Sequence, residues 1–216
     1  GHGVASAMMT ARLAGFLTGS SPEQNLAFQT GPDGDHVLLP PAAVAERFNR
    51  LMLEEIQAEQ YFTMAFAMVD RRTRQLDLVQ AGHPHPMLVR GDGQIQKLGR
   101  GGLPIGLIDG AVFDPVSAQI HPGDRLVMVS DGFTECPLPD GRDFGEDGLI
   151  ETLRSSADLS GADLLEAMVW DLAHAAGTES FPDDVSGIVL DLLPQEPGQH
   201  RPVPGIAQPR PRLFDW

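Results

Sequence analysis

One short apolar stretch, residues 126 to 129, constrains the fold more than any other part of the sequence. Its four apolar residues predict a buried strand, and the Ser130-Asp131-Gly132 sequence that follows is typical of a sharp turn at the edge of a sheet. Glycine lets the backbone pass close to a ligand, and an aspartate beside it is suited to a metal ion. An isolated Ser-Asp-Gly is more often a simple turn or cap.

A second acidic turn strengthens the metal interpretation. Asp183 and Asp184 precede the last apolar strand, predicted over residues 185–193. If this strand lies beside the one that ends at Val129, the carboxylates of the two turns meet at one edge of a sheet. Oxygen ligands without histidine or cysteine favour Mg²⁺ or Mn²⁺, and two such ions can activate a water for attack on phosphorus. The two turns are therefore compatible with metal-assisted hydrolysis of a phosphoester.

Composition narrows the range of partners. The 216 residues fit one domain, and 15 Lys and Arg against 30 Asp and Glu give a net charge of -15, which disfavours nucleic acids and anionic membranes. A single cysteine, Cys136, excludes an intrachain disulfide and a cysteine-based zinc site and favours the cytoplasm. No apolar run approaches the ~20 residues of a membrane span, and no signal peptide is evident.

Periodicity predicts helices on both sides of two β-hairpins. Helices are expected over residues 4–17, 40–57, 146–155 and 160–176, with Met8, Leu13 and Phe16 of the first helix in the core. Strands are expected over residues 62–70, 76–83, 87–90, 94–98, 113–120, 126–129 and 185–193. Residues 18–40 and 132–145 are expected to form loops. Residues 194–216 hold six of the 18 prolines and predict a disordered tail.

Six motifs, taken together and in their order, resemble one known group of proteins. They are GHGVASAMM (1–9), FTMAFAMVDRRT (62–73), LVQAGHPHPMLVR (78–90), GLPIGL (102–107), GDRLVMVSDGFTE (123–135) and DDVS (183–186). The chain resembles, from residue 1 to about residue 193, the SpoIIE-like branch of the bacterial metal-dependent serine/threonine protein phosphatases (PPM), the family of protein phosphatase 2C. The resemblance implies an α+β fold: a four-layer α-β-β-α sandwich of two antiparallel sheets flanked by helices, formed by residues 1–193.

The resemblance also implies a catalytic centre. It implies two Mn²⁺ or Mg²⁺ ions with Asp131 and Asp183 as ligands, and Asp184 as a supporting or third-metal ligand. A metal-bridging water would then attack phosphoserine or phosphothreonine. The implied substrate is a phosphorylated regulatory protein such as an anti-sigma-factor antagonist, and the implied parent chain carries an upstream sensor or receiver domain.

The sequence departs from the family pattern at its start. The pattern reads Asp, two residues, then Gly-His-Gly, and this chain begins at that first glycine. We expect a fragment of a longer protein, without the upstream strand and the first metal-binding Asp, that by itself binds metal poorly and hydrolyses slowly. His2 is a candidate proton donor to the leaving serine oxygen, with a solvated loop residue as the alternative.

Two other functions remain open on sequence alone. One is a non-catalytic binding module that keeps the PPM fold to dock a regulatory partner, and the other is a hydrolase of small phosphoesters. His83 and His85 flank Pro84 and resemble metal ligands, but a structural role is expected for them. Cys136 is expected to be a packed or exposed thiol, because no partner pattern of a cysteine nucleophile accompanies it.

Overall fold

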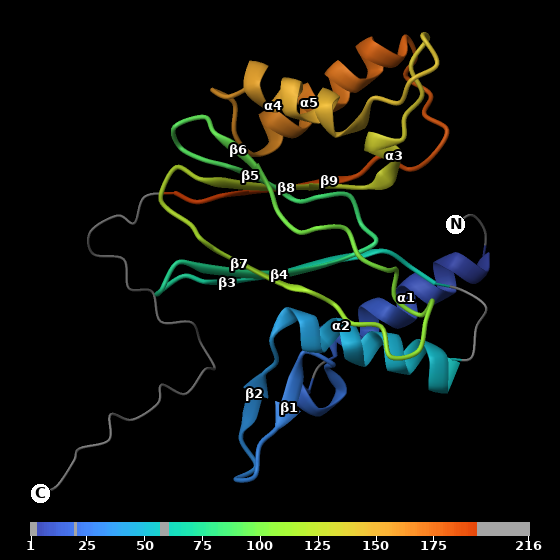
Figure 1. Ribbon diagram of the computed structural model, residues 1–216, viewed down its shortest axis with the longest axis vertical. Coiled ribbons are helices and arrows are strands. Elements are labelled where there is room, and N and C mark those ends of the chain that lie inside the picture. The colour runs from blue at the N-terminus through green and yellow to red at the C-terminus, as the bar shows by residue number, and fades with distance from the viewer. Residues whose placement is uncertain (1–3, 20, 57–60, 194–216) are drawn as a thin grey trace, which may run out of the picture.

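The computed structural model describes residues 4–19, 21–56 and 61–193. These residues form four layers: α1 and α2 on one side, two antiparallel sheets in the middle, and α4 and α5 on the other side (Figure 1). The predicted four-layer α-β-β-α sandwich is therefore confirmed.

Most of the predicted elements are present, with small shifts at their ends. The helices are α1 (Val4–Thr18), α2 (Pro41–Arg50), α3 (Asp131–Thr134), α4 (Gly145–Ser155) and α5 (Gly161–Ala176), with a 3-10 turn η1 (Pro22–Gln24) and a π-helical segment η2 (Leu51–Ile56). One sheet has the order β3-β4-β7, formed by β3 (Met64–Asp70), β4 (Gln75–Ala81) and β7 (Pro115–Gln119). The other has the order β6-β5-β8-β9, formed by β5 (Met87–Val89), β6 (Ile95–Lys97), β8 (Arg125–Val129) and β9 (Gly187–Asp191).

Alternation of side chains along the central strands divides the core into three parts. On β8, Val127 packs with α4 and α5, whereas Leu126 belongs to the cluster between the two sheets. On β4, Leu78 joins that same inter-sheet cluster, and Val79 packs with α1 and α2. Since successive strand residues point to opposite faces, each central strand contributes to two core layers. The apolar runs of these strands follow from burial on both faces.

Residues 18–40 are not simply a loop, as the sequence predicted. β1 (Phe28–Thr30) and β2 (His36–Leu38) pair as a separate antiparallel hairpin beside α2 (Figure 1). Gly34 adopts a positive φ of 82° in the connecting turn. Arg47 of α2 holds the hairpin by donating from Nη1 to the carbonyl oxygens of Leu26 at 3.3 Å and Phe28 at 2.7 Å. Strands of three residues are too short to show a period.

Three further expectations need correction. The predicted loop after the central strand begins with the short helix α3, because Ser130 has the extended backbone of a helix N-cap and Asp131 occupies the first turn. The second predicted helix is α-helical only to Arg50 and continues as η2. On α1, Leu13 and Phe16 pack against the core as predicted, but Met8 is 70% exposed.

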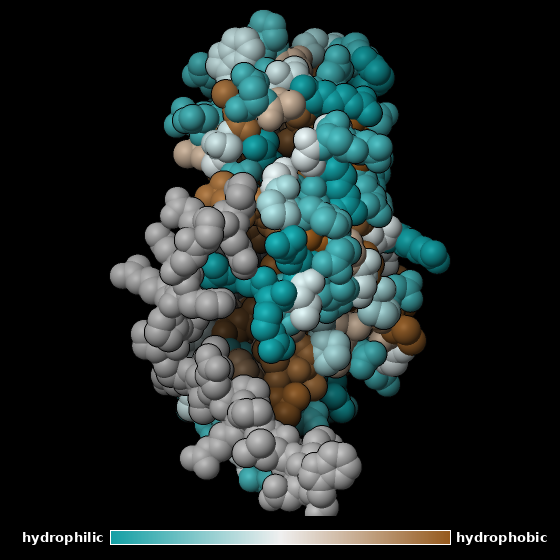
Figure 2. Space-filling view, turned by 90° about the vertical axis from the view of Figure 1, so that its left-hand side faces the viewer, coloured by the Kyte–Doolittle hydropathy of each residue, from teal (hydrophilic) through white to brown (hydrophobic). Residues whose placement is uncertain are grey.

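Several predictions fall on residues that the structure does not describe. They are the tail at 194–216, His2, and residue 57 at the end of the second predicted helix. Within the described residues, no helix combines the length and the apolar character needed to cross a membrane. Hydrophilic side chains cover most of the described surface on the face shown in Figure 2.

The buried carboxylate of Asp124 holds two turns together at one end of the β6-β5-β8-β9 sheet. Asp124 is 4% exposed and accepts hydrogen bonds from Arg90 Nη1 at 2.8 Å and from the backbone N–H groups of His121 at 2.9 Å and Gly91 at 3.0 Å. Burial by itself raises the pKa of Asp124, but the His121 N–H and the Arg90 guanidinium outweigh it, and the net pKa is lowered. The ionised carboxylate thus joins the β7–β8 turn to the β5–β6 hairpin.

We expect Asp124→Asn to lower the free energy of unfolding by about 1–3 kcal/mol at neutral pH, since it removes the charge that these buried donors bind. Because the pKa is lower in the folded state, the stabilisation is complete above the unfolded value of about 4 and is lost as pH falls through the folded value. Urea unfolding at pH 7 and at pH 3 measures both effects.

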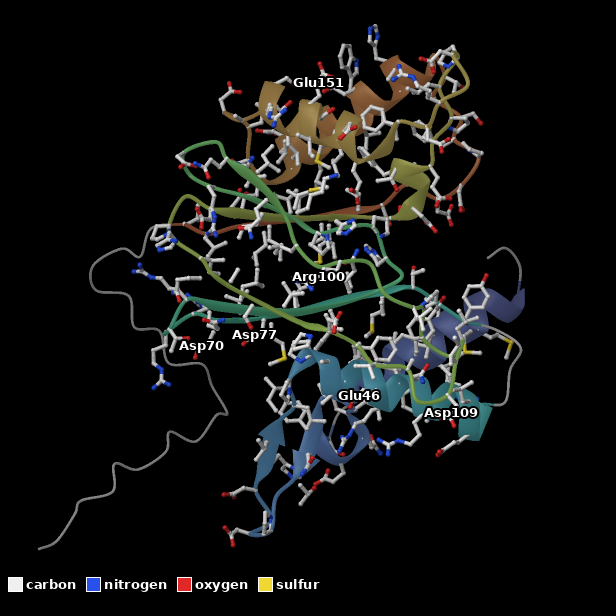
Figure 3. All side chains as sticks on the ribbon, viewed as in Figure 1. Glu46, Asp70, Asp77, Arg100, Asp109 and Glu151 are labelled. Atoms are coloured by element: carbon white, nitrogen blue, oxygen red, sulfur yellow. The ribbon has the colours of Figure 1, made fainter. Side chains whose placement is uncertain are left out.

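The matched control is Asp109→Asn, which changes an exposed carboxylate in a loop away from this turn (Figure 3). It should unfold like the parent chain at both pH values. Equal losses in the two variants, or a difference between Asp124→Asn and the parent that grows in acid, would contradict the role given to Asp124.

Candidate functional site

The two acidic turns lie at neighbouring strand ends. β8 and β9 pair in antiparallel register, with Val129 opposite Gly187. The end of β8 and the start of β9 therefore lie at the same edge of the sheet, next to α3 (Figure 1). The predicted adjacency of these strands is confirmed, whereas a metal-binding role for their aspartates remains a prediction.

Ser130 joins the two turns directly. Its backbone N–H donates to the carbonyl of Ser186 at 2.9 Å, and its Oγ donates to the carbonyl of Asp184 at 2.9 Å. The same Oγ accepts from the backbone N–H of Ser186 at 3.0 Å. The sequence alone predicts no such role, because the partners lie more than fifty residues away. The local sequence offers only a hydroxyl residue directly after a buried strand, which does not identify its partners.

Gly132 allows the turns to approach each other. A Cβ atom at this buried position would lie 2.5 Å from the carbonyl oxygen of Asp184 and 3.4 Å from the carbonyl carbon of Asp183. No side chain fits there unless backbone moves. The glycine of the Ser-Asp-Gly motif is therefore required by close packing between the two acidic turns.

The three candidate carboxylates are all exposed at this edge. Asp131 Oδ1 accepts from the N–H of Gly132 at 3.0 Å, and Asp183 Oδ1 accepts from the N–H of Asp184 at 2.8 Å. Asp131 also begins α3, where the helix dipole favours negative charge. Among residues 4–19, 21–56 and 61–193, however, no group of three or more His, Cys, Asp or Glu side chains is arranged to hold a metal ion.

His83 and His85 take part in local contacts, consistent with the structural role expected for them. His83 Nδ1 lies 3.0 Å from the carbonyl oxygen of Pro84. His85 Nδ1 lies 2.6 Å from Glu146 Oε1, and Lys97 Nζ lies 2.8 Å from Glu146 Oε2. Burial raises the pKa of Glu146, but the bonds from Lys97 and His85 outweigh it and leave the pKa lowered. This cluster ties the loop after β4 to the start of α4.

Cys136 is a packed thiol, one of the two alternatives expected from the sequence. Its side chain is 1% exposed within the core beneath α4 and α5, and burial, with a contribution from Asp143, raises the pKa of the thiol. A raised pKa and a buried sulfur are the opposite of what a nucleophile needs. The candidate proton donor His2 lies outside the described residues.

The acidity of the chain is not concentrated at this edge. Figure 3 labels exposed acidic side chains on well-separated parts of the fold, including Glu46 on α2, Asp70 on β3, Asp109 in a loop and Glu151 on α4. Most of the negative charge is therefore ordinary solvated surface, and only its local arrangement at residues 131 and 183–184 is specific to the candidate site.

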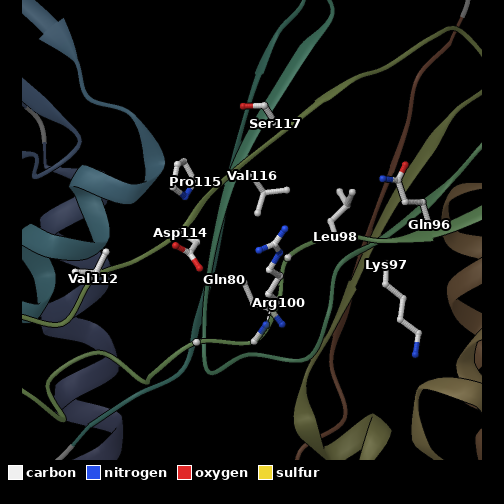
Figure 4. A pocket seen from close by; sticks show the side chains of 13 residues that line it. Gln80, Gln96, Lys97, Leu98, Arg100, Val112, Asp114, Pro115, Val116 and Ser117 are labelled. Atoms are coloured by element: carbon white, nitrogen blue, oxygen red, sulfur yellow. Dashed lines mark hydrogen bonds between the residues drawn. The ribbon is translucent and has the colours of Figure 1, made fainter.

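A polar cavity of about 500 Å³ lies elsewhere, between β6 and β7 (Figure 4). Arg100, Asp114 and the buried Gln80 contribute to its lining, and Gln80 Oε1 accepts from the N–H of Gly101 at 2.7 Å. Neither acidic turn contributes to this lining. The cavity is thus separate from the candidate site.

Comparisons with known proteins define the class of this fold. The PP2C domain of SiaA from Pseudomonas aeruginosa superposes with a TM-score of 0.66 at 24% identity, covering 88% of this chain and 72% of that one. The phosphatase domain of SpoIIE from Bacillus subtilis superposes with a TM-score of 0.56 at 19% identity, covering 92% and 78%. At these identities the likeness establishes the fold alone, and that fold is the one of PP2C-type phosphatase domains.

A family model identifies the family. The model described as "Stage II sporulation protein E (SpoIIE)" matches residues 1–193, and the chain belongs to this family. Phosphoserine phosphatase RsbP of Bacillus subtilis is 25% identical over 196 residues, which cover 89% of this chain and 43% of RsbP. The chain spans less than half of the length of the curated relatives that it matches.

We expect Ser130→Ala to lower the free energy of unfolding by about 1 kcal/mol, since it removes two hydrogen bonds between the turns. Ser130→Thr keeps the hydroxyl and should recover most of this loss. Gly132→Ala should also be destabilising, because its Cβ would overlap the Asp184 carbonyl. Thermal or urea unfolding measures these changes.

The control for the glycine is Gly15→Ala in the last turn of α1, where no atom lies within 4 Å of the added Cβ. This change should be neutral or stabilising, because alanine is the better helix former. If Gly132→Ala were equally well tolerated, this result would contradict the close packing of Gly132 against the Asp184 carbonyl.

Proposed function

We propose that this chain is a Mn²⁺- or Mg²⁺-dependent phosphoserine/phosphothreonine protein phosphatase domain. The observation that carries the proposal is the hydrogen-bonded contact between the Ser130-Asp131-Gly132 turn and the Asp183-Asp184 turn in a chain of the SpoIIE family. Two comparisons support it: RsbP is named a phosphoserine phosphatase, and the SpoIIE phosphatase domain is described as Mn presoaked.

The donor chemistry of the site fits a hard divalent cation. Asp131 and Asp183 would be ligands and Asp184 a supporting ligand, and all three present carboxylate oxygens, which such ions prefer. Mg²⁺ and Mn²⁺ commonly keep several waters, so few protein ligands are needed. When bound, such ions supply Lewis-acid stabilisation of phosphoryl oxygens and an activated water.

The residues of the chain then have separate tasks. Ser130 and Gly132 fix the spacing between the two acidic turns, and Asp131 and Asp183 provide the charge that attracts the cation. His2 is the candidate proton donor to the leaving oxygen. Cys136 takes no part, because it is buried with a raised pKa.

The proposed substrate is a phosphorylated regulatory protein of the anti-sigma-factor-antagonist type, and the proposed location is the cytoplasm. The names of RsbU and RsbP as phosphoserine phosphatases support the phosphoserine part of this proposal. We also propose that residues 1–193 form the phosphatase domain of a bacterial signalling protein with an upstream sensor or receiver domain, and that residues 194–216 are a separate tail.

One observation favours a second candidate, a non-catalytic binding module of the same fold that docks a regulatory partner. In the described part of the chain no three acidic or histidine side chains converge as a metal site. Calorimetric titration with Mn²⁺ separates the two candidates: a catalytic domain binds the ion at the acidic turns, whereas a binding module shows no uptake that depends on Asp131.

For the phosphatase, we expect Asp131→Asn and Asp183→Asn, each introduced into the full-length parent protein, to reduce Mn²⁺-dependent phosphate release from a phosphoserine protein at least about a hundredfold. The reason is that even changes in residues that only orient metal ligands cost roughly 10–100-fold. Phosphate release from a phosphoprotein, a phosphopeptide and free phosphoserine is measured in parallel, so that a small-phosphoester hydrolase is recognised by its preference for the free amino acid.

Asp140→Asn is the matched control, since it removes one exposed carboxylate from the loop that follows α3 without touching either turn. It should keep full activity. Unchanged activity in Asp131→Asn, or metal-independent hydrolysis by the parent chain, would contradict the proposed chemistry.

A further inference from the structure

An apolar groove lies on the outer layer of the fold, away from the acidic turns. It encloses about 550 Å³ between α5 and the segment before β9, and its apolar lining residues are Leu165, Val169, Trp170, Ala173 and Phe181. Trp170 is 65% exposed and Val169 is 42% exposed, although both lie on a helix that packs against the core. We refer to these five residues as the α5 groove.

Trp170 presents an open aromatic face. Its indole ring stacks on the imidazole of His174 with ring centroids 5.2 Å apart and an interplanar angle of 3°. The stacking holds the indole in one orientation over the groove and leaves its other face available. An arginine guanidinium stacks well on such a face.

The charged residues that line the α5 groove are both acidic. Glu166 and Glu179 line it beside the apolar residues, and both are exposed. Residues 155–193 contain eight Asp and Glu and no Lys or Arg. A segment that fills this groove should therefore combine aromatic or aliphatic side chains with arginine or lysine.

The last seven residues of the chain have this chemistry. Residues 210–216 read Arg-Pro-Arg-Leu-Phe-Asp-Trp, with Arg210 and Arg212 beside three large apolar side chains. The excess of positive charge there is notable in a chain of net charge -15. Arginine, phenylalanine and tryptophan are also residues that commonly anchor interfaces.

The chain between β9 and residue 210 is long enough to bring residues 210–216 to the α5 groove. The N–H of Gly161, at the start of α5, donates to Asp191 Oδ2 at the end of β9 at 2.8 Å, so the chain leaves β9 beside the beginning of α5. Val169 lies about 12 Å farther along the helix. Residues 194–209 form a connection of 16 residues, five of them proline, and at ~3.1 Å per residue a proline-rich connection of this length reaches up to roughly 50 Å. A tether of this length gives an effective concentration in the millimolar range.

We propose that the α5 groove is the docking site of residues 210–216 of the same chain. Leu213, Phe214 and Trp216 fill the apolar floor, and the two arginines face Glu166, Glu179 and the open face of Trp170. Because the segment is tethered, an intrinsic dissociation constant of about 0.1 mM is tight enough to keep it bound most of the time.

The two tryptophans of the chain provide the test. In the full chain carrying Trp170→Phe, which keeps an aromatic face at position 170 for the arginines, Trp216 is the only indole, and its acrylamide quenching reports its exposure. We expect the Stern–Volmer constant to be several-fold lower than in the same chain with Val169→Lys added, which places a cation in the groove. Ala157→Lys adds the same charge at an exposed turn outside the groove and should leave the quenching unchanged.

A second variant tests the proposal without changing the α5 groove, in case Val169→Lys impairs folding. Arg210→Gln, Arg212→Gln and Phe214→Ala together change no residue of the described fold, and they should raise the quenching of Trp216 to that of a free indole. Equal quenching in all four chains would overturn the proposal. Protection that appears only as protein concentration rises would overturn it as well, because the segment would then occupy the groove of a second copy.

Discussion

The antiparallel pairing of β8 with β9 is the interaction on which the candidate site depends. Its register runs from Arg125 opposite Asp191 to Val129 opposite Gly187. At one end the Arg125 guanidinium and the Asp191 carboxylate form an ion pair of 2.5 Å, and at the other end Ser130 bonds the two turns. A slip of one residue would turn the side chains to the opposite faces of the sheet and would break the contacts at both ends. These two contacts therefore stabilise the observed register. The register of β8 and β9 therefore determines the spacing of the two acidic turns.

The position of the first acid follows from the same strand. β8 is buried on both faces, with Val127 in one core layer and Leu126 in another, so a carboxylate within it would lose its hydration without a partner. Asp131 comes two residues after Val129, where the chain has left the sheet and started α3. Asp131 can therefore lie only beyond the end of the buried strand. Gly132 then allows the Asp183-Asp184 turn to approach it closely.

The sequence predicts those parts of the molecule that have a period or a characteristic turn. The long helices and the two central hairpins carry such patterns, and so do the acidic turns. The β1–β2 hairpin does not, because its strands have three residues each. The role of Ser130 depends on a partner more than fifty residues away, and no local pattern reveals it. A complete set of metal ligands depends on side-chain orientation and cannot be read from spacing.

Charge connects the candidate site to the rest of the fold. Residues 155–193 supply α5, the Asp183-Asp184 turn and β9. They contain eight acids and no Lys or Arg, although Arg125 of β8 pairs with one of these acids, Asp191. Repulsion among such groups destabilises a compact state, so any cation that binds here also stabilises the fold, by an amount set by its concentration and affinity. A divalent ion at the turns and an arginine-bearing segment on α5 would relieve the same excess at two places. Folding stability and the proposed cation binding would therefore be coupled in this half of the domain. Salt that screens the charges should weaken the binding of a cation and should also reduce the repulsion among the acids.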